Sequence, residues 1–209
     1  MIKPLTILHK VYSRFVGFYH FRKYKMIFRN FGGNSYVNKP LRINHPENIS
    51  IGHSVRVGIQ TWLAAAPLTG NKNCELVFKD GVMIGDYNHI YATGKIVIEN
   101  DVLTANFVYI SDNLHSFEDI GKPITKQPIK QLRPVVIGEG SWLGEHVCVI
   151  GASVGKHSVI GANSVVTHDV PDYCVAVGSP ARIIKRYNPN SQLWEKTDEY
   201  GNFFVKTKM

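Results

Sequence analysis

One histidine stands in a segment whose composition suits catalysis. The segment is SDNLHSFEDIGKPI at 111–124, and it places His115 among polar and acidic residues. Because an imidazole titrates near neutral pH, a histidine in such a loop can act as a general base that accepts a proton from an attacking nucleophile. The plain alternative is an ordinary surface histidine, one of nine in the chain.

A catalytic histidine also needs a group that fixes its second ring nitrogen. Asp112, Glu118 and Asp119 are close enough in sequence to supply it, and each is equally well explained as a solvated loop charge. Asp112 has a further alternative, contact with a substrate. A covalent mechanism through Cys148 or Cys174 is the weaker expectation.

The composition excludes several classes of protein. The chain has 209 residues, 44% hydrophobic and 19% charged, which is too apolar for a disordered polymer. Its three cysteines are far apart and form no CxxC pair, so neither a disulfide scaffold nor a zinc ribbon fits, and a reducing compartment is expected. No segment reaches the ~20 apolar residues of a membrane span, and no signal peptide is recognisable. We therefore expect a cytoplasmic protein.

The excess of positive charge lies at the N-terminus. The net charge is +8, and residues 1–30 hold seven lysines and arginines but no acidic residue. This distribution argues against a nucleic-acid-binding surface over the whole protein. Helical spacing of apolar residues predicts a basic amphipathic helix over about residues 5–28. Such a helix either caps the fold, packs on another subunit, or lies on an anionic membrane surface, possibilities that the sequence leaves open.

A six-residue repeat runs through the middle of the chain. Hydrophobic residues recur at this spacing in five blocks of three, and glycine follows seven of these fifteen repeat positions. The repeat positions are Ile51, Val57, Leu63; Phe78, Ile84, Ile90; Ile98, Thr104, Ile110; Ile137, Leu143, Val149; Val154, Ile160 and Val166. A period of six predicts short strands with a turn after each, three strands to a coil, and Gly, Asn or Asp at the turns. Stacked coils would bury the leading residues as one column. A stack of antiparallel strands would lack the phased glycines.

The largest interruption of the repeat spans 113–134 and contains His115. A loop projecting from a rigid scaffold is a common place for function. The chain thus divides into a helical arm (1–40), a repeat domain (41–186) and a tail (187–209) that we expect to form a capping hairpin.

Several motifs in one order resemble a known family of enzymes. They are the hexapeptide repeats, the segment at 111–124, WLG at 142–144, VIGANSVVTHDVP at 159–171 and GSPAR at 178–182. In these the chain resembles the galactoside, maltose and capsular-polysaccharide O-acetyltransferases over about residues 41–186. The resemblance implies an all-β fold, a left-handed parallel β-helix that departs from the usual right-handed crossover. It also implies a homotrimer with coenzyme sites at subunit boundaries, and direct acetyl transfer from acetyl-CoA to a sugar hydroxyl.

The resemblance assigns roles to individual residues. His115 matches the general base of the family. Asp112, Asn88 and Trp142 become substrate-binding candidates, although Trp142 is equally explained as a subunit contact. The positions that match coenzyme contacts are Gly144, Ala162, Thr167, Arg182 and Lys185, and the cations among them suit phosphate oxygens. His168 stands where the family often has lysine, which weakens the match at that point.

Other functions known for this fold predict different sequence features. A carbonic anhydrase of similar fold needs a second histidine five residues after the first, where this chain has Ile120, so no metal is expected. An N-acetyltransferase acting on an amino sugar or nucleotide sugar, and a non-catalytic trimeric scaffold, are the alternatives. We expect an O-acetyltransferase for a sugar or lipid-linked saccharide in surface polysaccharide or lipopolysaccharide biosynthesis. It would lie in the cytoplasm, with peripheral contact to the inner membrane surface through residues 1–30 as the extension of this hypothesis.

Overall fold

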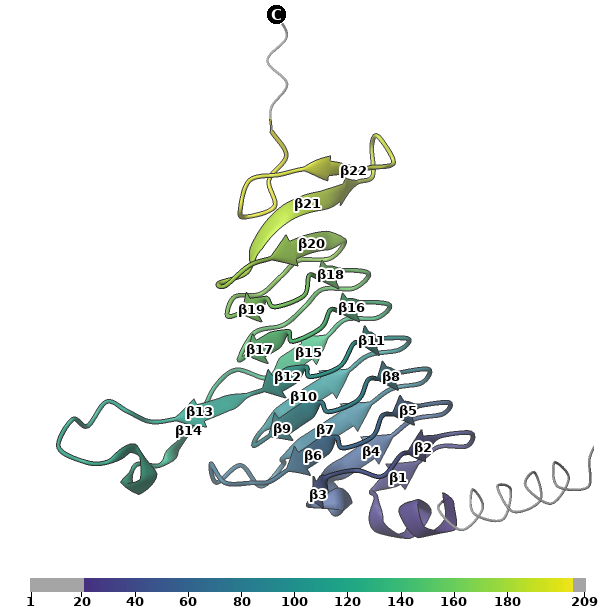
Figure 1. Cartoon of the computed structure of the whole chain (residues 1–209), viewed down its shortest axis with the longest axis vertical. Helices are drawn as coiled ribbons and strands as arrows, with labels where there is room; N and C mark the ends of the chain where they lie inside the picture. Colours follow the sequence, from purple (N-terminus) through teal and green to yellow (C-terminus); the bar gives the residue numbers. More distant parts are fainter. Residues whose placement is uncertain (1–20, 205–209) are drawn as a thin grey trace, which may run out of the picture.

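The chain winds into a left-handed parallel β-helix with three flat faces. The computed structural model describes residues 21–204. Up to residue 150, successive strands of the prism belong to successive faces, and each pairs in parallel with the strand one coil away (Figure 1). The predicted all-β class and coiled architecture are therefore confirmed.

The strands are grouped here by face. Face 1 contains β1 (Asn30–Phe31), β4 (Ile49–Ile51), β7 (Glu75–Phe78), β10 (Lys95–Ile98) and β15 (Val135–Ile137). Face 2 contains β2 (Tyr36–Val37), β5 (Arg56–Val57), β8 (Met83–Ile84), β11 (Leu103–Thr104), β16 (Trp142–Leu143), β18 (Val159–Ile160), β20 (Cys174–Val177), β21 (Arg182–Asn188) and β22 (Leu193–Lys196). Face 3 contains β3 (Arg42–Asn44), β6 (Trp62–Ala65), β9 (His89–Ala92), β12 (Tyr109–Ser111), β17 (Cys148–Ile150) and β19 (Val165–Val166). Two 3₁₀ turns, η1 (Pro46–Asn48) and η2 (Ile124–Lys126), lie outside these sheets.

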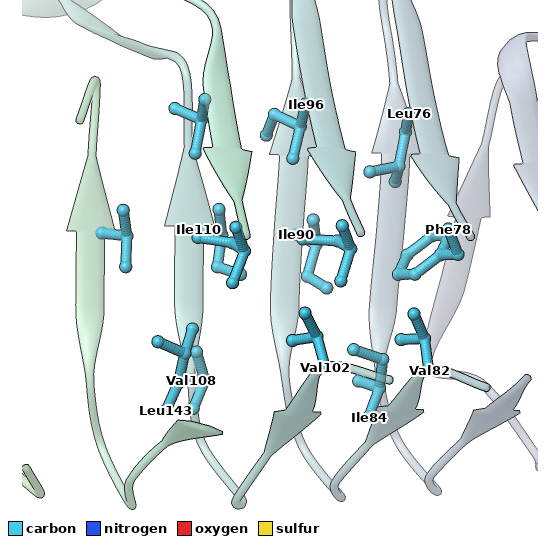
Figure 2. Close-up of a cluster of buried hydrophobic side chains, with 14 of the residues drawn as sticks. Leu76, Phe78, Val82, Ile84, Ile90, Ile96, Val102, Val108, Ile110 and Leu143 are labelled. Carbon is cyan, nitrogen blue, oxygen red and sulfur yellow. The ribbon is translucent and has the colours of Figure 1, made fainter. Parts of the chain in front are cut away.

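The repeat positions form the core. All fifteen are buried, none more than 4% exposed, and strand register places each one beside its counterpart in the next coil, as with Ile90 and Ile110. Figure 2 shows part of this column, in which Ile90 and Ile110 lie side by side from successive coils and Phe78 belongs to the same coil as Ile90. Each buried aliphatic side chain contributes about 1.5–3 kcal/mol relative to exposure. The predicted column is therefore the main apolar support of the fold.

The turns between face 2 and face 3 differ from expectation. Glycine, asparagine or aspartate was predicted at positive φ, but Tyr87, Phe107 and His146 have φ values of 58°, 56° and 57°. Their rings stack at centroid distances of 4.9 Å. Stacking between coils offsets part of the cost of a left-handed conformation in bulky residues. The conformational preferences of single residues do not predict this stacking, because it forms only when successive coils are in register.

The described part of the N-terminal arm caps the first coil. Residues 21–27 are helical, and Tyr24 and Phe28 are buried against Phe31, with ring centroids 5.5 and 5.6 Å away. The rest of the predicted helix, with three of the seven basic residues of segment 1–30, lies outside the described residues. Among residues 21–204 there is no helix with the length and apolar character to cross a membrane.

The C-terminal end is closed by antiparallel strands. β21 pairs with β20 and then with β22, so the hairpin starts at Arg182, earlier than the expected boundary at 187. A bridge between Thr197 and Phe203 closes the turn that follows. A second antiparallel pair, β13 (Asn113–His115) with β14 (Ile129–Gln131), projects from the prism between β12 and β15, where the repeat is interrupted (Figure 1).

Candidate active site

A buried carboxylate fixes the root of the projecting hairpin. Asp112 follows β12 and is fully buried. It accepts hydrogen bonds from three consecutive backbone N–H groups of the preceding coil, those of Thr93 (2.8 Å), Gly94 (2.8 Å) and Lys95 (2.7 Å). The Thr93 hydroxyl donates a further bond at 3.2 Å. Asp112 therefore positions the hairpin with its oxygens enclosed and occupied. Its contact with a substrate stays a prediction.

The returning strand is fixed by a glutamine. Gln131 donates from Nε2 to the Asp112 carbonyl at 2.8 Å, and its Oε1 accepts from the Thr69 and Thr93 hydroxyls at 2.7 and 3.0 Å. Thr69 belongs to the insertion between β6 and β7, which thus supports the hairpin. Sequence reasoning missed Gln131 and Thr69; the signal was that two interruptions of the repeat fall at the same corner of the prism.

His115 lies at the end of β13, opposite Ile129, and is exposed. Its ring makes no hydrogen bond or ion pair with any residue in the described part of the chain. The carboxylates expected to orient it have other partners, because Glu118 pairs with Lys130 at 2.5 Å and Asp119 with Lys122 at 2.7 Å. The hydrogen bond from Lys130 lowers the pKa of the Glu118 carboxyl to about 2. None of the three predicted carboxylates contacts His115.

Asn88 is a structural residue of the coil. Its side chain is 1% exposed and donates to the carbonyls of Gly85 and Ala105, each at 3.0 Å, and to the Thr104 hydroxyl at 2.9 Å. Its own carbonyl accepts from the Val108 N–H. Its hydrogen-bonding groups are used within its own coil, at Gly85, and with the next coil. Its role in binding a substrate stays a prediction.

The predicted coenzyme residues fall in two places. Gly144, Ala162, Arg182 and Lys185 lie along face 2 and its border with face 3, whereas Thr167 follows β19 at the border of face 3 and face 1. Gly144 and Ala162 follow strands of successive coils, where the Gly144 N–H donates to the Ile160 carbonyl at 2.8 Å. A Cβ on Gly144 would lie 2.8 Å from the Ala162 nitrogen, so only glycine permits this approach. Trp142, 47% exposed, lies on face 2 just before Gly144.

Strand register connects Trp142 to a cation near the end of the coil. Trp142 pairs with Val159, Val159 with Val175, and Val175 with Lys185. Arg182 lies on the same strand as Lys185. The structure therefore places Trp142 and Lys185 in one register column, and Arg182, opposite Val177, lies beside that column on β21.

The surroundings of Arg182 contain an opposing charge. Its Nε lies 2.8 Å from Oε2 of Glu199, and both side chains are about half exposed. Arg182, Glu199 and His168 line a hollow of about 310 Å³, while the predicted phosphate contact Thr167 has its hydroxyl 3.0 Å from the His168 ring. A phosphate that binds Arg182 must therefore compete with a carboxylate of the tail.

His115 and the predicted coenzyme turn at Gly144 and Ala162 lie at different corners of the prism, whereas Thr167 lies at the corner of the hairpin, two coils further along. The hairpin leaves between face 3 and face 1, whereas Gly144 and Ala162 lie between face 2 and face 3. At the hairpin tip, Phe117, Ile120 and Ile124 are exposed. Within one chain, His115 and the turn at Gly144 and Ala162 are thus separated by face 3.

The cysteines do not resemble nucleophiles. Burial raises the pKa of the Cys148 and Cys174 thiols. For Cys74, burial and, to a lesser extent, the charge of Asp112 raise the pKa to about 12. Thiolate formation is therefore disfavoured at neutral pH. Among residues 21–204, no three His, Cys, Asp or Glu side chains come together as a metal site.

Comparison with known proteins agrees with the motifs and the coil. The family described as "Hexapeptide repeat of succinyl-transferase" matches residues 134–168. In Escherichia coli K12, WbbJ, which bears the name of a lipopolysaccharide biosynthesis O-acetyl transferase, is 34% identical over 167 residues, 77% of this chain and 83% of WbbJ. Galactoside O-acetyltransferase of the same organism is 30% identical over 165 residues, 78% of this chain and 66% of that enzyme.

A solved structure supports the fold. AntD, an N-acyltransferase from Bacillus cereus in complex with dTDP and 3-hydroxybutyryl-CoA, has a TM-score of 0.66 and covers 80% of this chain and 87% of its own, at 21% identity. At this identity the likeness shows the fold alone. The fold and motifs define a left-handed β-helix acyltransferase. The chain belongs to the hexapeptide-repeat acetyltransferase family.

Replacing the carboxylate at the hairpin root tests its positioning role. In Asp112→Ala, three backbone N–H groups lose their acceptor, and each unsatisfied buried donor costs about 1–3 kcal/mol. We expect faster amide hydrogen exchange at residues 93–95 and in the hairpin, measured by mass spectrometry. Asp119→Ala, at the exposed tip, is the control. Unchanged protection at residues 93–95 in Asp112→Ala would contradict the assignment.

Proposed function

We propose that this chain transfers an acetyl group from acetyl-CoA to a hydroxyl of a saccharide, with His115 as general base. The observation that carries the proposal is the placement of His115 on a hairpin anchored by Asp112 and Gln131, in a chain that matches WbbJ over 83% of its length. The names of WbbJ and galactoside O-acetyltransferase support oxygen as the acceptor atom. The fold it shares with AntD keeps transfer to an amine as the alternative.

The proposed chemistry starts from the His115 imidazole, which has no hydrogen-bond partner within residues 21–204. One ring nitrogen of His115 accepts the hydroxyl proton while the oxygen forms a bond to the acetyl carbonyl carbon. As the carbon–sulfur bond breaks, the imidazolium returns its proton to the departing sulfur, so that the products are the acetyl ester and free thiol. Acetyl-CoA supplies the activated acetyl group. His115 ends the cycle neutral, and no acyl-enzyme is formed.

The residues of face 2 fit a coenzyme thioester. The close approach of Gly144 and Ala162 leaves a turn without large side chains, along which a narrow chain can lie. Lys185, Arg182 and Thr167 supply donors for phosphate oxygens near the end of the coil. Trp142 would pack beside the acyl end. In this orientation the coenzyme has its phosphates near β21 and its thioester near β16.

Homotrimer assembly would complete the site. Because His115 and Gly144 lie at different corners of one chain, a neighbour's hairpin must reach the border of face 2 and face 3. The exposed Phe117, Ile120 and Ile124 at the hairpin tip offer an apolar contact for that neighbour. A head-to-tail contact of this kind closes into a ring when the rotation is one third of a turn.

The cellular setting is proposed from charge and from relatives. WbbJ carries a name from lipopolysaccharide biosynthesis, which supports a role in lipopolysaccharide or surface polysaccharide assembly. The basic residues of segment 1–30 suit a peripheral position on the cytoplasmic face of an anionic membrane. There the enzyme would meet a lipid-linked saccharide.

His115→Ala tests the catalytic assignment. We expect kcat for release of free CoA thiol to fall by about 10²–10⁴-fold, the usual contribution of a general base, with the Kd for CoA unchanged. His45→Ala, at another exposed histidine, is the control. Matched hydroxy and amino sugars in the wild-type assay separate O- from N-transfer. Full activity of His115→Ala would remove the base from this residue.

Mixed trimers test whether the site is shared. His115→Ala keeps the face-2 turn, and Ala162→Trp keeps the hairpin but blocks the turn at an exposed position. Each variant alone should be inactive. Refolded together in equal amounts, they should regain about a quarter of wild-type activity, because one of four neighbour combinations supplies both intact parts. A mixture that stays inactive would place both parts in a single chain.

Glu199→Gln tests the phosphate position. The substitution releases Arg182 from a surface ion pair, typically about 0.2–1 kcal/mol, so CoA should bind up to about fivefold more tightly by calorimetry. Glu139→Gln, also exposed, controls for the change in net charge. In an Arg182→Ala background the gain should vanish. If Glu199→Gln binds CoA no better than wild type, Arg182 is not a phosphate contact.

A further inference from the structure

A hollow on face 2 lies beyond Trp142, on the side away from Lys185. It measures about 270 Å³ and is bordered by β2, β5, β8 and β11. Its lining includes Tyr36, Asn38, Arg56, Met83, Asp86 and Leu103. Figure 1 shows these strands continuing from β16 toward the N-terminal end of the prism.

Strand register makes the hollow part of one outward column. Leu103 pairs with Trp142, Met83 with Leu103, Arg56 with Met83, and Tyr36 with Arg56. Tyr36, Met83, Leu103 and Trp142 are each between 42% and 50% exposed. Three strand spacings separate Arg56 from Trp142, or ~14 Å. The column is thus an exposed apolar strip that contains one cation.

The direction in which the coenzyme lies along face 2 determines which ligand this strip can contact. This step rests on the proposed function, which sets phosphates near Lys185 and the thioester near Trp142. The acceptor must approach the thioester from the side that the coenzyme leaves open. On face 2 that side is the strip from Leu103 to Tyr36. A ligand reaching from Trp142 to Arg56 is longer than a single sugar ring.

Polar groups in the hollow have unused hydrogen-bonding capacity. Within residues 21–204, the Arg56 guanidinium, the Tyr36 hydroxyl and the Asn38 side-chain amide make no hydrogen bond or ion pair. Asp86 uses Oδ1 to accept from the Ile59 N–H at 2.8 Å and retains its second oxygen. Arginine binds carboxylate or phosphate oxygens through two parallel hydrogen bonds, and an exposed tyrosine ring offers a flat apolar surface.

We propose that this hollow is an acceptor subsite that selects an oligosaccharide bearing a negative charge. Arg56 binds the carboxylate or phosphate, Tyr36 packs against a sugar ring, and Asn38 and Asp86 bind hydroxyls. The reacting hydroxyl lies near Trp142, about three strand spacings from the anionic group. The chain therefore acetylates an acidic saccharide in preference to a neutral one of the same length.

Arg56→Gln tests the subsite in the full-length protein, with Lys79→Gln as control for loss of one exposed positive charge elsewhere on the prism. Release of CoA thiol is measured with galactotriose, a phosphorylated galactotriose and trigalacturonate, so that the arms distinguish phosphate from carboxylate. We expect wild type and Lys79→Gln to show a KM about tenfold or more lower for one anionic trisaccharide than for galactotriose. In Arg56→Gln that preference should be lost.

Binding measurements keep the outcomes separate. Calorimetry with each trisaccharide, in the presence of CoA, should show Arg56-dependent binding of the anionic ligand even if turnover is slow. Equal binding of neutral and anionic trisaccharides by wild type, no binding of either anionic ligand, or an unchanged preference in Arg56→Gln overturns the subsite. Failure of wild type to bind CoA would instead count against the proposed function, and unaltered thermal unfolding excludes misfolding of the variant.

Discussion

In-register hydrogen bonding between successive coils is the constraint on which the rest of the molecule depends. Each strand pairs in parallel with its counterpart one coil away, so residues far apart in sequence become neighbours at the strand spacing of about 4.8 Å. Tyr36 and Trp142 belong to one column for this reason. The buried aliphatic column maintains that register, since a one-residue slip would turn its members outward.

A rigid prism limits where catalysis can occur. Its interior is filled with buried aliphatic side chains, so the proposed reacting groups must meet on its surface, at corners and projections. The hairpin carrying His115 is the projection, and Asp112 and Gln131 hold both its strands to the coil. Because the hairpin and the Gly144 turn occupy different corners, the proposed chemistry follows from assembly and not from the fold of one chain.

The periodicity in the sequence predicted much of this structure. The repeat positions, the projecting segment and the closing hairpin could be predicted from the sequence pattern. In a hexapeptide repeat the residues that recur every six positions are the ones that form the core. The structural roles of Asn88 and Asp112 could not be predicted, since both side chains bind backbone groups of adjacent coils and only three-dimensional register reveals those partners. Gln131 and Thr69, 62 positions apart, were hidden for the same reason. The Arg182–Glu199 pair likewise depends on how the tail folds back.

The central claim is that the imidazole from one subunit meets a thioester held along face 2 of its neighbour. A crystal structure of the protein with CoA bound measures this directly. The account predicts the sulfur beside Trp142 and the Gly144 turn, the phosphates near Lys185, and a His115 ring nitrogen from the adjacent subunit within about 3.5 Å of the sulfur or one water away. A coenzyme bound on another face, or a His115 ring remote from the sulfur in every subunit, would contradict it.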